Sequence, residues 1–190
     1  YPIIKQSVVY PLNNDAGSIT KALIDVKGKT VALYSAHLDY RHYSCYLPRG
    51  YDGSTWQKID ESIIDADSIL SQSRKSKRLE AINVFIEDSR QEILQGNIVI
   101  MGGDLNEPSH LDWTTETKDL WDHNGAIVEW EVSKKLSDNG FIDTYRYFNS
   151  DVVNYPGFTY PSGNDAVEVS KLTWAPEADE RERIDFIYFH

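Results

Sequence analysis

Residues 97–108 place a short buried strand directly before two polar side chains. Residues 98–101 form a continuous apolar run, which is too short for a helix and is typical of a strand inside a sheet. A glycine pair follows, and glycines in a strand let another backbone or a ligand approach closely. Asp104 and Asn106 come next at alternate positions, which point to the same side in extended backbone. The stretch therefore predicts a carboxylate and a carboxamide held at a sheet edge.

This pair of side chains suits chemistry on a phosphate or a metal ion. Asp104 can bind a hard cation or accept a proton, and the Asn106 amide can donate to a phosphoryl oxygen. The alternative is an ordinary strand that ends in an Asp/Asn turn, since both residue types are common in turns. These residues alone leave both interpretations open.

The acidic composition narrows the choice of partners. The 190 residues are enough for one domain with a substantial core, and 41% hydrophobic residues are typical of a globular protein. A formal net charge of -11 disfavours non-specific binding to long nucleic acid but is compatible with a small phosphorylated substrate whose charge is met by metal ions.

No apolar run approaches the roughly 20 residues of a transmembrane helix. Cys45 is the single cysteine, which excludes an intrachain disulfide and a cysteine zinc site.

Local patterns predict a hairpin and a helix ahead of the buried strand. Alternating residues on either side of the tight turn at 27–29 indicate two paired strands. Apolar residues at helical spacing over 79–95 indicate a helix that packs on the sheet. The predicted elements are strands at 3–10, 19–26, 30–38 and 98–101, a turn at 13–17, helices within 65–95 and at 129–136, and apolar segments at 171–175 and 184–189.

The second strand of the hairpin carries a histidine at its end, followed by a long loop. His37 ends its strand as Asp104 does, which favours a role in the same site, and the alternative is a core histidine satisfied by a neighbour. The loop at 40–58 contains four tyrosines and two arginines near its start. Because arginine binds phosphate bidentately and rings stack on planar groups, the loop predicts a substrate wall that includes Tyr40 and Arg41. The alternative is an exposed insertion without a ligand role.

Two further polar-aromatic positions lie just after the Asp104 motif. His110 and Trp113 are predicted as substrate contacts because they follow the strand end closely in sequence. The alternative for His110 is an ordinary surface histidine. These positions extend the predicted site into the loop that begins at Pro108.

The last apolar segment carries an aspartate. Asp185 has apolar neighbours on both sides and is predicted to be buried with a specific partner at the site. The alternative is an ion pair with Arg183, for which a structural role is favoured. The acidic run at 177–182 is predicted to be a solvated loop.

Four segments, taken in order, resemble the endonuclease/exonuclease/phosphatase superfamily. These are Ser-Ala-His-Leu-Asp at 35–39, Gly-Asp-Leu-Asn at 103–106, Gly-Phe-Ile-Asp-Thr at 140–144 and Arg-Ile-Asp-Phe-Ile at 183–187. The superfamily includes deoxyribonuclease I-like nucleases, abasic-site endonucleases, sphingomyelinases and inositol phosphatases. Within it the sequence looks most like uncharacterised proteins of Bacteroides-type gut bacteria, with which it shares stretches that include 106–113 and 174–181.

The resemblance implies a fold and a reaction. The implied fold is a single α/β domain over residues 1–190, a four-layer α/β/β/α sandwich of two mixed sheets with helices outside. The implied reaction is hydrolysis of a phosphodiester or phosphomonoester by in-line attack of water, with Mg²⁺ or Mn²⁺ as cofactor. Asp104 would be the general base or a metal ligand, and Asn106 would bind the metal or orient the scissile phosphate. His37 would contact the phosphate or aid the leaving group, and Asp185 would orient a catalytic histidine.

The sequence departs from the family pattern at both ends. The family has an early strand with Asn and a metal-binding Glu, and a closing Ser-Asp-His motif, and neither is found here. We therefore expect a domain without its N-terminal part and its C-terminal Ser-Asp-His strand, and this chain alone is expected to be poorly active. The alternative is a non-catalytic fragment or pseudoenzyme that keeps the fold and binds a ligand. A secreted or periplasmic location is left open by the resemblance.

Overall fold

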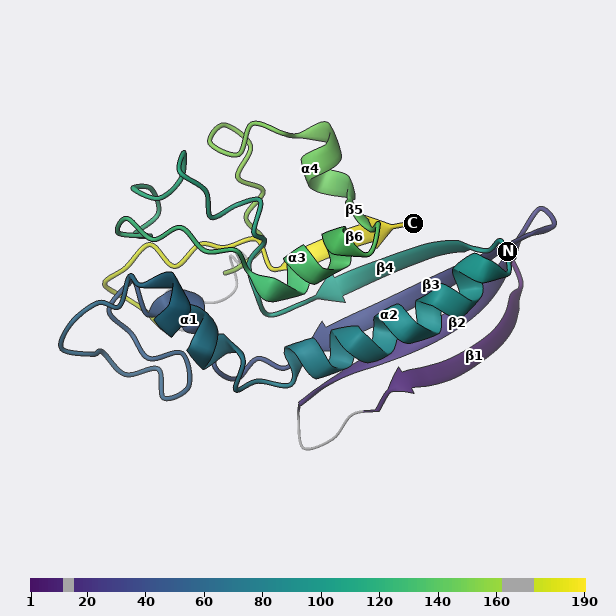
Figure 1. Ribbon diagram of the computed structural model, residues 1–190, viewed down its shortest axis with the longest axis horizontal. Helices are drawn as coiled ribbons and strands as arrows, with labels where there is room; N and C mark the ends of the chain where they lie inside the picture. Colours follow the sequence, from purple (N-terminus) through teal and green to yellow (C-terminus); the bar gives the residue numbers. More distant parts are fainter. Residues whose placement is uncertain (12–15, 162–172) are drawn as a thin grey trace, which may run out of the picture.

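A six-stranded mixed sheet organises the molecule (Figure 1). The computed structural model describes residues 1–11, 16–161 and 173–190. The strands lie side by side in the order β1-β2-β3-β4-β6-β5, and of these pairs β3 and β4 are parallel whereas the others are antiparallel. The strands are β1 (Ile3–Tyr10), β2 (Gly17–Val26), β3 (Lys29–Leu38), β4 (Ile98–Asp104), β5 (Ile142–Asp143) and β6 (Asp185–Phe189).

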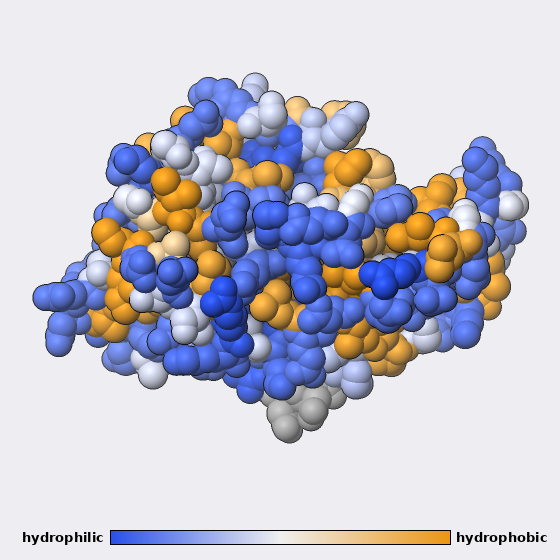
Figure 2. Space-filling model, in the orientation of Figure 1, coloured by the Kyte–Doolittle hydropathy of each residue, from blue (hydrophilic) through white to orange (hydrophobic). Residues whose placement is uncertain are grey.

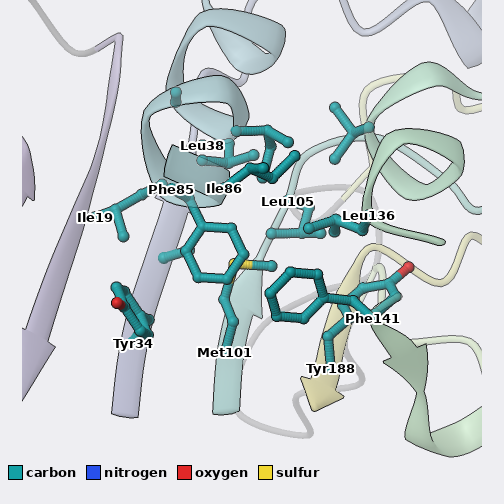
Figure 3. Packing of buried hydrophobic residues seen from close by; sticks show 14 of the residues in the cluster. Ile19, Tyr34, Leu38, Phe85, Ile86, Met101, Leu105, Leu136, Phe141 and Tyr188 are labelled. Carbon is teal, nitrogen blue, oxygen red and sulfur yellow. The ribbon is translucent and has the colours of Figure 1, made fainter. Parts of the chain in front are cut away.

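Helices cover one face of this sheet. In Figure 1, α2 and α3 lie in front of the strands, and in Figure 2 hydrophilic side chains spread over this side of the molecule, interrupted by smaller hydrophobic patches. The buried side of α2 carries Phe85, whose ring contacts Tyr34 of β3 at 4.8 Å and Phe141 at 5.1 Å between centroids (Figure 3). The helices are α1 (Ala66–Ser73), α2 (Arg78–Leu94), α3 (Glu131–Asp138), α4 (Thr144–Phe148) and the 3₁₀ helix η1 (Ser44–Tyr46).

The opposite face of the sheet carries no layer in the part of the chain that the structure describes. Strand alternation sends Tyr34 and Leu38 of β3 into the core, while Leu33 and His37 lie on the other side and are exposed. Ile98 and Ile187 on the neighbouring strands are exposed as well. The predicted α/β class is therefore confirmed as one mixed sheet with helices, and the second sheet of the expected sandwich is not among the described residues.

The predicted elements agree with the structure apart from details at their ends. The hairpin becomes β2 and β3, and the helix expected over 79–95 is α2, which packs on the sheet as predicted. The strand predicted over 98–101 continues through the glycine pair to Asp104. The predicted turn at 13–17 falls largely outside the described residues. Of the apolar segment predicted at 171–175, the structure describes residues 173–175, which are irregular. No helix in the described ranges is long and apolar enough to span a membrane.

Gly103 is needed where β4 approaches β3. Its φ is +141°, and a Cβ atom there would lie 1.8 Å from the carbonyl oxygen of Ala36. We expect Gly103→Ala to lower the free energy of unfolding by about 2–4 kcal/mol through backbone strain and overlap, measured by urea denaturation. Gly28→Ala is the control, because its φ is also positive but the space around it is open, and it should cost about 1 kcal/mol. Equal losses in the two variants would contradict the close approach.

A second hydrophobic cluster is formed largely by residues from the loops that lie beyond the carboxyl ends of β3 and β4 (Figure 1), and we call it the loop cluster. The loop at 40–58 contributes buried side chains to it, so the alternative of an exposed insertion is wrong. The acidic run at 177–182 is also not fully solvated, because Glu180 and Glu182 are buried. The loop cluster consists of Tyr43, Cys45, Tyr46, Leu47, Tyr51, Ile69, Leu70, Trp113, Ala126, Val128, Trp130, Ala175 and Ile184.

Glu182 anchors this loop region through a buried cation. Arg49 Nη2 lies 2.8 Å from Glu182 Oε1, and Trp113 Nε1 donates to Glu182 Oε2 at 3.2 Å. Burial acts to raise the pKa of the Glu182 carboxyl, but the positive charge of Arg49 and the neighbouring hydrogen bonds lower it below its usual value. The acidic loop is therefore partly an internal structural element, a role that its charge pattern did not indicate.

Candidate active site

Strand register brings three of the predicted site residues into one row. His37 of β3 lies opposite Asp104 of β4, and Asp104 lies opposite Asp185 of β6. Residues opposite one another in a sheet share a face, and here it is the open face, because the adjacent residues point into the core. We call these three side chains the polar row. Within the row, His37 Nε2 lies 3.9 Å from Asp104 Oδ2.

Asp104 has the electrostatics of a proton acceptor near neutral pH. Its side chain is 30% exposed, and its Oδ1 accepts the backbone N–H of Asn106 at 2.8 Å. Burial raises the pKa of the Asp104 carboxyl to about 6, and the negative charge of Asp185 adds to the rise. The N–H of Asn106 acts in the opposite direction and limits the shift.

Asn106 lies two residues after the end of β4, in a tight turn. Its φ is +50°, a conformation that asparagine tolerates better than most residues. The side-chain amide is buried and donates through Nδ2 to the carbonyl oxygen of Leu38 at 2.9 Å, which leaves its second N–H for a ligand. The backbone therefore forms the Asp/Asn turn that was considered as the alternative. The Asn106 side chain is nevertheless fixed next to the polar row.

His37 and Asp185, the two outer residues of the polar row, are both exposed. His37 is not a core histidine, because its side chain is 71% exposed. Asp185 is also exposed, so the prediction that it is buried is wrong: its alternate position on β6 faces the open side of the sheet. It is not paired with Arg183, whose side chain turns to the interior instead.

Arg183 holds a buried ionic network together, which confirms its predicted structural role. Its guanidinium lies 2.9 Å from Asp112 and 2.8 Å from Asp143. Asp112 also pairs with Arg146 at 2.6 Å. Asp143 in turn accepts the backbone N–H groups of Tyr145 and Arg146 and so caps α4. The network joins the strand that carries Asp185 to the 109–112 loop and α4.

The predicted substrate contacts divide into two groups. Tyr40 is 46% exposed and lines a pocket beside Asn106. Arg41 lies next to it and binds the Asp39 carboxylate with both Nε and Nη2, at 2.8 and 3.0 Å. Tyr40 thus lies near the polar row through this pocket, and Arg41 is its neighbour in the sequence.

His110 and Trp113 are not brought to the polar row. His110 lines a different hollow with Asp143 and Arg146, and burial lowers its pKa. Trp113 is 1% exposed, stacks on His123 with 3.7 Å between ring centroids and donates to Glu182. Proximity in sequence to Asp104 therefore misplaced both, because the chain turns away into the loop cluster after Asn106.

The donor set for a metal ion is of the right chemical type but small. Asp104 and Asp185 supply carboxylates on one face, and the amide oxygen of Asn106 is nearby. Among the residues that the structure describes, no group of three or more His, Cys, Asp or Glu side chains could hold a metal ion. Since Mg²⁺ prefers six oxygen ligands and retains water readily, a cation held by these groups alone would stay largely hydrated.

Sequence reasoning missed three aromatic residues beside the polar row. Trp56, Tyr160 and Trp174 line the same pocket as Tyr40 and Asn106. They come from distant segments, and no local pattern connects them. Aromatic residues make up 12% of the chain, and this composition was the one sign of an aromatic site in the sequence. Composition does not show where in the fold such a site lies.

Comparison with known proteins gives distant likenesses. No family model matches the chain. It is 28% identical over 189 residues to the uncharacterized protein F14F9.5 of Caenorhabditis elegans, covering 98% of this chain and 56% of that protein. Among solved structures, truncated TDP2 from Caenorhabditis elegans is 17% identical with a TM-score of 0.48, covering 98% of this chain and 52% of that one.

A further solved structure is an endonuclease/exonuclease/phosphatase family protein from Leptotrichia buccalis. It is 15% identical, with a TM-score of 0.38, and the match covers 100% of this chain and 50% of that one. The chain thus spans about half the length of the proteins that it matches.

Proposed function

We propose that the whole protein is a divalent-metal-dependent phosphoesterase and that the polar row is part of its reaction centre. The observation that carries this proposal is the register of β3, β4 and β6, which aligns His37, Asp104 and Asp185 on one open face. Three separately predicted residues meet there, although they come from distant parts of the sequence. The extent of the domain and the roles of these residues stay predictions.

Each residue has a role that its surroundings support. Asp104, with a pKa of about 6, takes a proton from the attacking water near neutral pH. The free N–H of the Asn106 amide orients a phosphoryl oxygen, and His37 contacts the phosphate or the leaving group. Asp104 in its alternative role as a ligand, together with the amide oxygen of Asn106, would hold Mg²⁺ or Mn²⁺, which would polarise the phosphate.

The charge of the chain favours a small substrate. A net charge of -11 opposes binding along a polyanion, so we propose a small phosphorylated compound or phosphodiester rather than long nucleic acid. The second candidate is a non-catalytic protein that keeps the fold and binds a ligand. The small donor set among the described residues is what favours this candidate.

A pair of histidine variants tests the proposal. The assay is hydrolysis of bis(p-nitrophenyl) phosphate with Mg²⁺, Mn²⁺ or Ca²⁺, by this 190-residue chain and by the protein in its full natural length. We expect metal-stimulated hydrolysis by the full-length protein and little by this chain. His37→Gln should lower kcat about 10²-fold or more, as expected for loss of a group that acts on the phosphate or the leaving group.

His110→Gln is the matched control, because the same substitution is made in the separate hollow and should leave kcat unchanged. Equal effects of the two substitutions would contradict the assignment of His37. Full activity of the 190-residue chain would show that the expected missing parts are not needed. Absence of metal-stimulated hydrolysis by the full-length protein would favour the non-catalytic candidate.

A further inference from the structure

An aromatic pocket of about 360 Å³ opens next to the polar row. Asn106 lines the pocket two positions after Asp104, and Thr159, which precedes the lining residue Tyr160, accepts the backbone N–H of Asp185 at 3.1 Å. The segments that form it gather beyond the carboxyl ends of β3 and β4 (Figure 1). We call this the aromatic pocket, and its lining is Tyr40, Tyr43, Trp56, Asn106, Tyr160, Trp174 and Ile184.

A buried glutamate fixes the wall of the aromatic pocket from behind. Glu180 Oε2 accepts the hydroxyl of Tyr46 at 2.5 Å and the backbone N–H groups of Trp174 and Ala175 at 3.2 and 3.1 Å. The Tyr46 hydroxyl also lies 3.3 Å from that of Tyr160. One carboxylate therefore positions two pocket segments that are distant in sequence. Such preorganisation reduces the entropy that a ligand must overcome on binding.

The lining indicates the kind of group that fits. Five of the seven lining residues present aromatic rings, and none of the seven carries a full charge at neutral pH. A volume near the lower end of the range for ligand pockets suits one ring system rather than a polymer. Trp56 and Trp174 are 5.6 Å apart between ring centroids and tilted by 35°, too close to hold another ring between them. A ligand would instead stack on Trp174, 55% exposed, and on Tyr40.

We infer that the aromatic pocket binds a planar aromatic ring carried by the ester group of the substrate phosphate, either directly, as in an aryl phosphate, or through a sugar, as in a nucleotide. This inference deepens the proposed function and rests on it for the position of the phosphate over the polar row. The pocket holds the uncharged ring, and the phosphate lies at Asp104 and Asn106. It thereby selects phosphate esters that carry such a ring over those whose ester group is a sugar or an alkyl group without an aromatic ring.

Calorimetric titration in EDTA tests ring recognition without turnover. The ligands are phenyl phosphate, thymidine 5′-monophosphate, ribose 5-phosphate and inorganic phosphate. We expect the two aromatic phosphates to bind about tenfold or more tightly than ribose 5-phosphate, because each stacked ring contributes substantially to affinity. Whichever of these two aromatic phosphates binds more tightly then shows whether the pocket prefers a phenyl ring or a nucleobase. Equal dissociation constants for phenyl phosphate and ribose 5-phosphate would overturn the inference.

Variants of the two most exposed rings locate the binding. Trp174→Leu and Tyr40→Leu should each weaken binding of the preferred aromatic phosphate about fivefold or more and leave ribose 5-phosphate unaffected. Trp121→Phe is the control, since Trp121 packs on Phe158 outside the aromatic pocket. Unchanged affinity in both Leu variants would overturn the inference.

The inference and the proposed function fail in different ways. Ring-dependent binding without hydrolysis by the full-length protein would keep the pocket assignment and reject the enzyme. Hydrolysis with equal kcat/KM for methyl and phenyl esters, together with equal dissociation constants, would keep the enzyme and reject the pocket.

Discussion

Asp104→Asn should abolish hydrolysis and at the same time stabilise the protein above pH 6. The carboxamide cannot accept the proton of the attacking water and is a poorer ligand for a hard cation, so kcat should fall about 10²–10⁴-fold. The hydrogen bond from the N–H of Asn106 can persist, because asparagine retains one acceptor oxygen. The variant therefore removes the charge while keeping the local turn.

The sign of the stability change follows from the raised pKa. The Asp104 carboxyl titrates at about 6 in the folded protein, against 3.8 in an unperturbed chain, so ionisation opposes folding. The penalty is absent below about pH 4, develops as the pH rises to 6 and is complete above it. Asp104→Asn should thus raise the free energy of unfolding by about 1–3 kcal/mol at pH 8, with no gain at pH 4.

Urea denaturation in EDTA at pH 4, 6 and 8 measures this change without bound metal. Asp60→Asn is the control, since Asp60 is exposed in a loop and the same substitution there should change stability by less than about 0.5 kcal/mol. A gain for Asp104→Asn that does not depend on pH would contradict the titration argument. Retained hydrolysis would reject Asp104 as the base.

Arg183→Met should destabilise the protein by about 3–5 kcal/mol at pH 7, because it leaves two buried carboxylates without their shared cation. The Arg183 side chain is 2% exposed and bridges Asp112 and Asp143. Arg146 remains beside Asp112, but Asp143 loses its cation within the network. Since a domain of this size is typically stable by about 5–15 kcal/mol, this is a large share of the total.

Arg181→Met provides a matched control two residues earlier. Arg181 pairs with Asp179 at the surface and lies 4.8 Å from the centroid of the Phe158 ring, and its side chain is 52% exposed. Such pairs contribute about 0–1 kcal/mol, so the same substitution should have little effect on the midpoint of urea denaturation. Similar losses in the two variants would show that the buried network is not what stabilises this segment.

The sequence could predict those elements that are determined by residues close to one another in the chain. The turn at 27–29 and the alternation on both sides of it specify β2 and β3, and helical spacing specifies α2. The meeting of His37 with Asp104 followed from two strand ends, because parallel neighbours bring their carboxyl ends to one edge. These features depend on interactions within a segment or between regular elements, which composition and spacing encode directly.

Features that depend on distant segments could not be predicted. Glu180 and Glu182 lie in an acidic run whose charge pattern predicts a solvated loop. In the structure Tyr46 donates to Glu180 and Arg49 pairs with Glu182, and both partners come from another loop. Trp113 follows the Asp104 motif but packs on His123 in the loop cluster. Asp185 was expected to be buried because its neighbours are apolar, and only the register of β6 shows which face it occupies.

The pairing of β6 with β4 has a consequence for how the molecule acquires its structure. The hairpin of β2 and β3 joins neighbouring residues, and β4 can add to it once α2 has formed, whereas β6 must reach β4 across the whole intervening loop region. Pairings between remote segments require costly loop closure and form slowly. His37 and Asp104 can thus be placed early on the folding pathway, and Asp185 joins them in a late step.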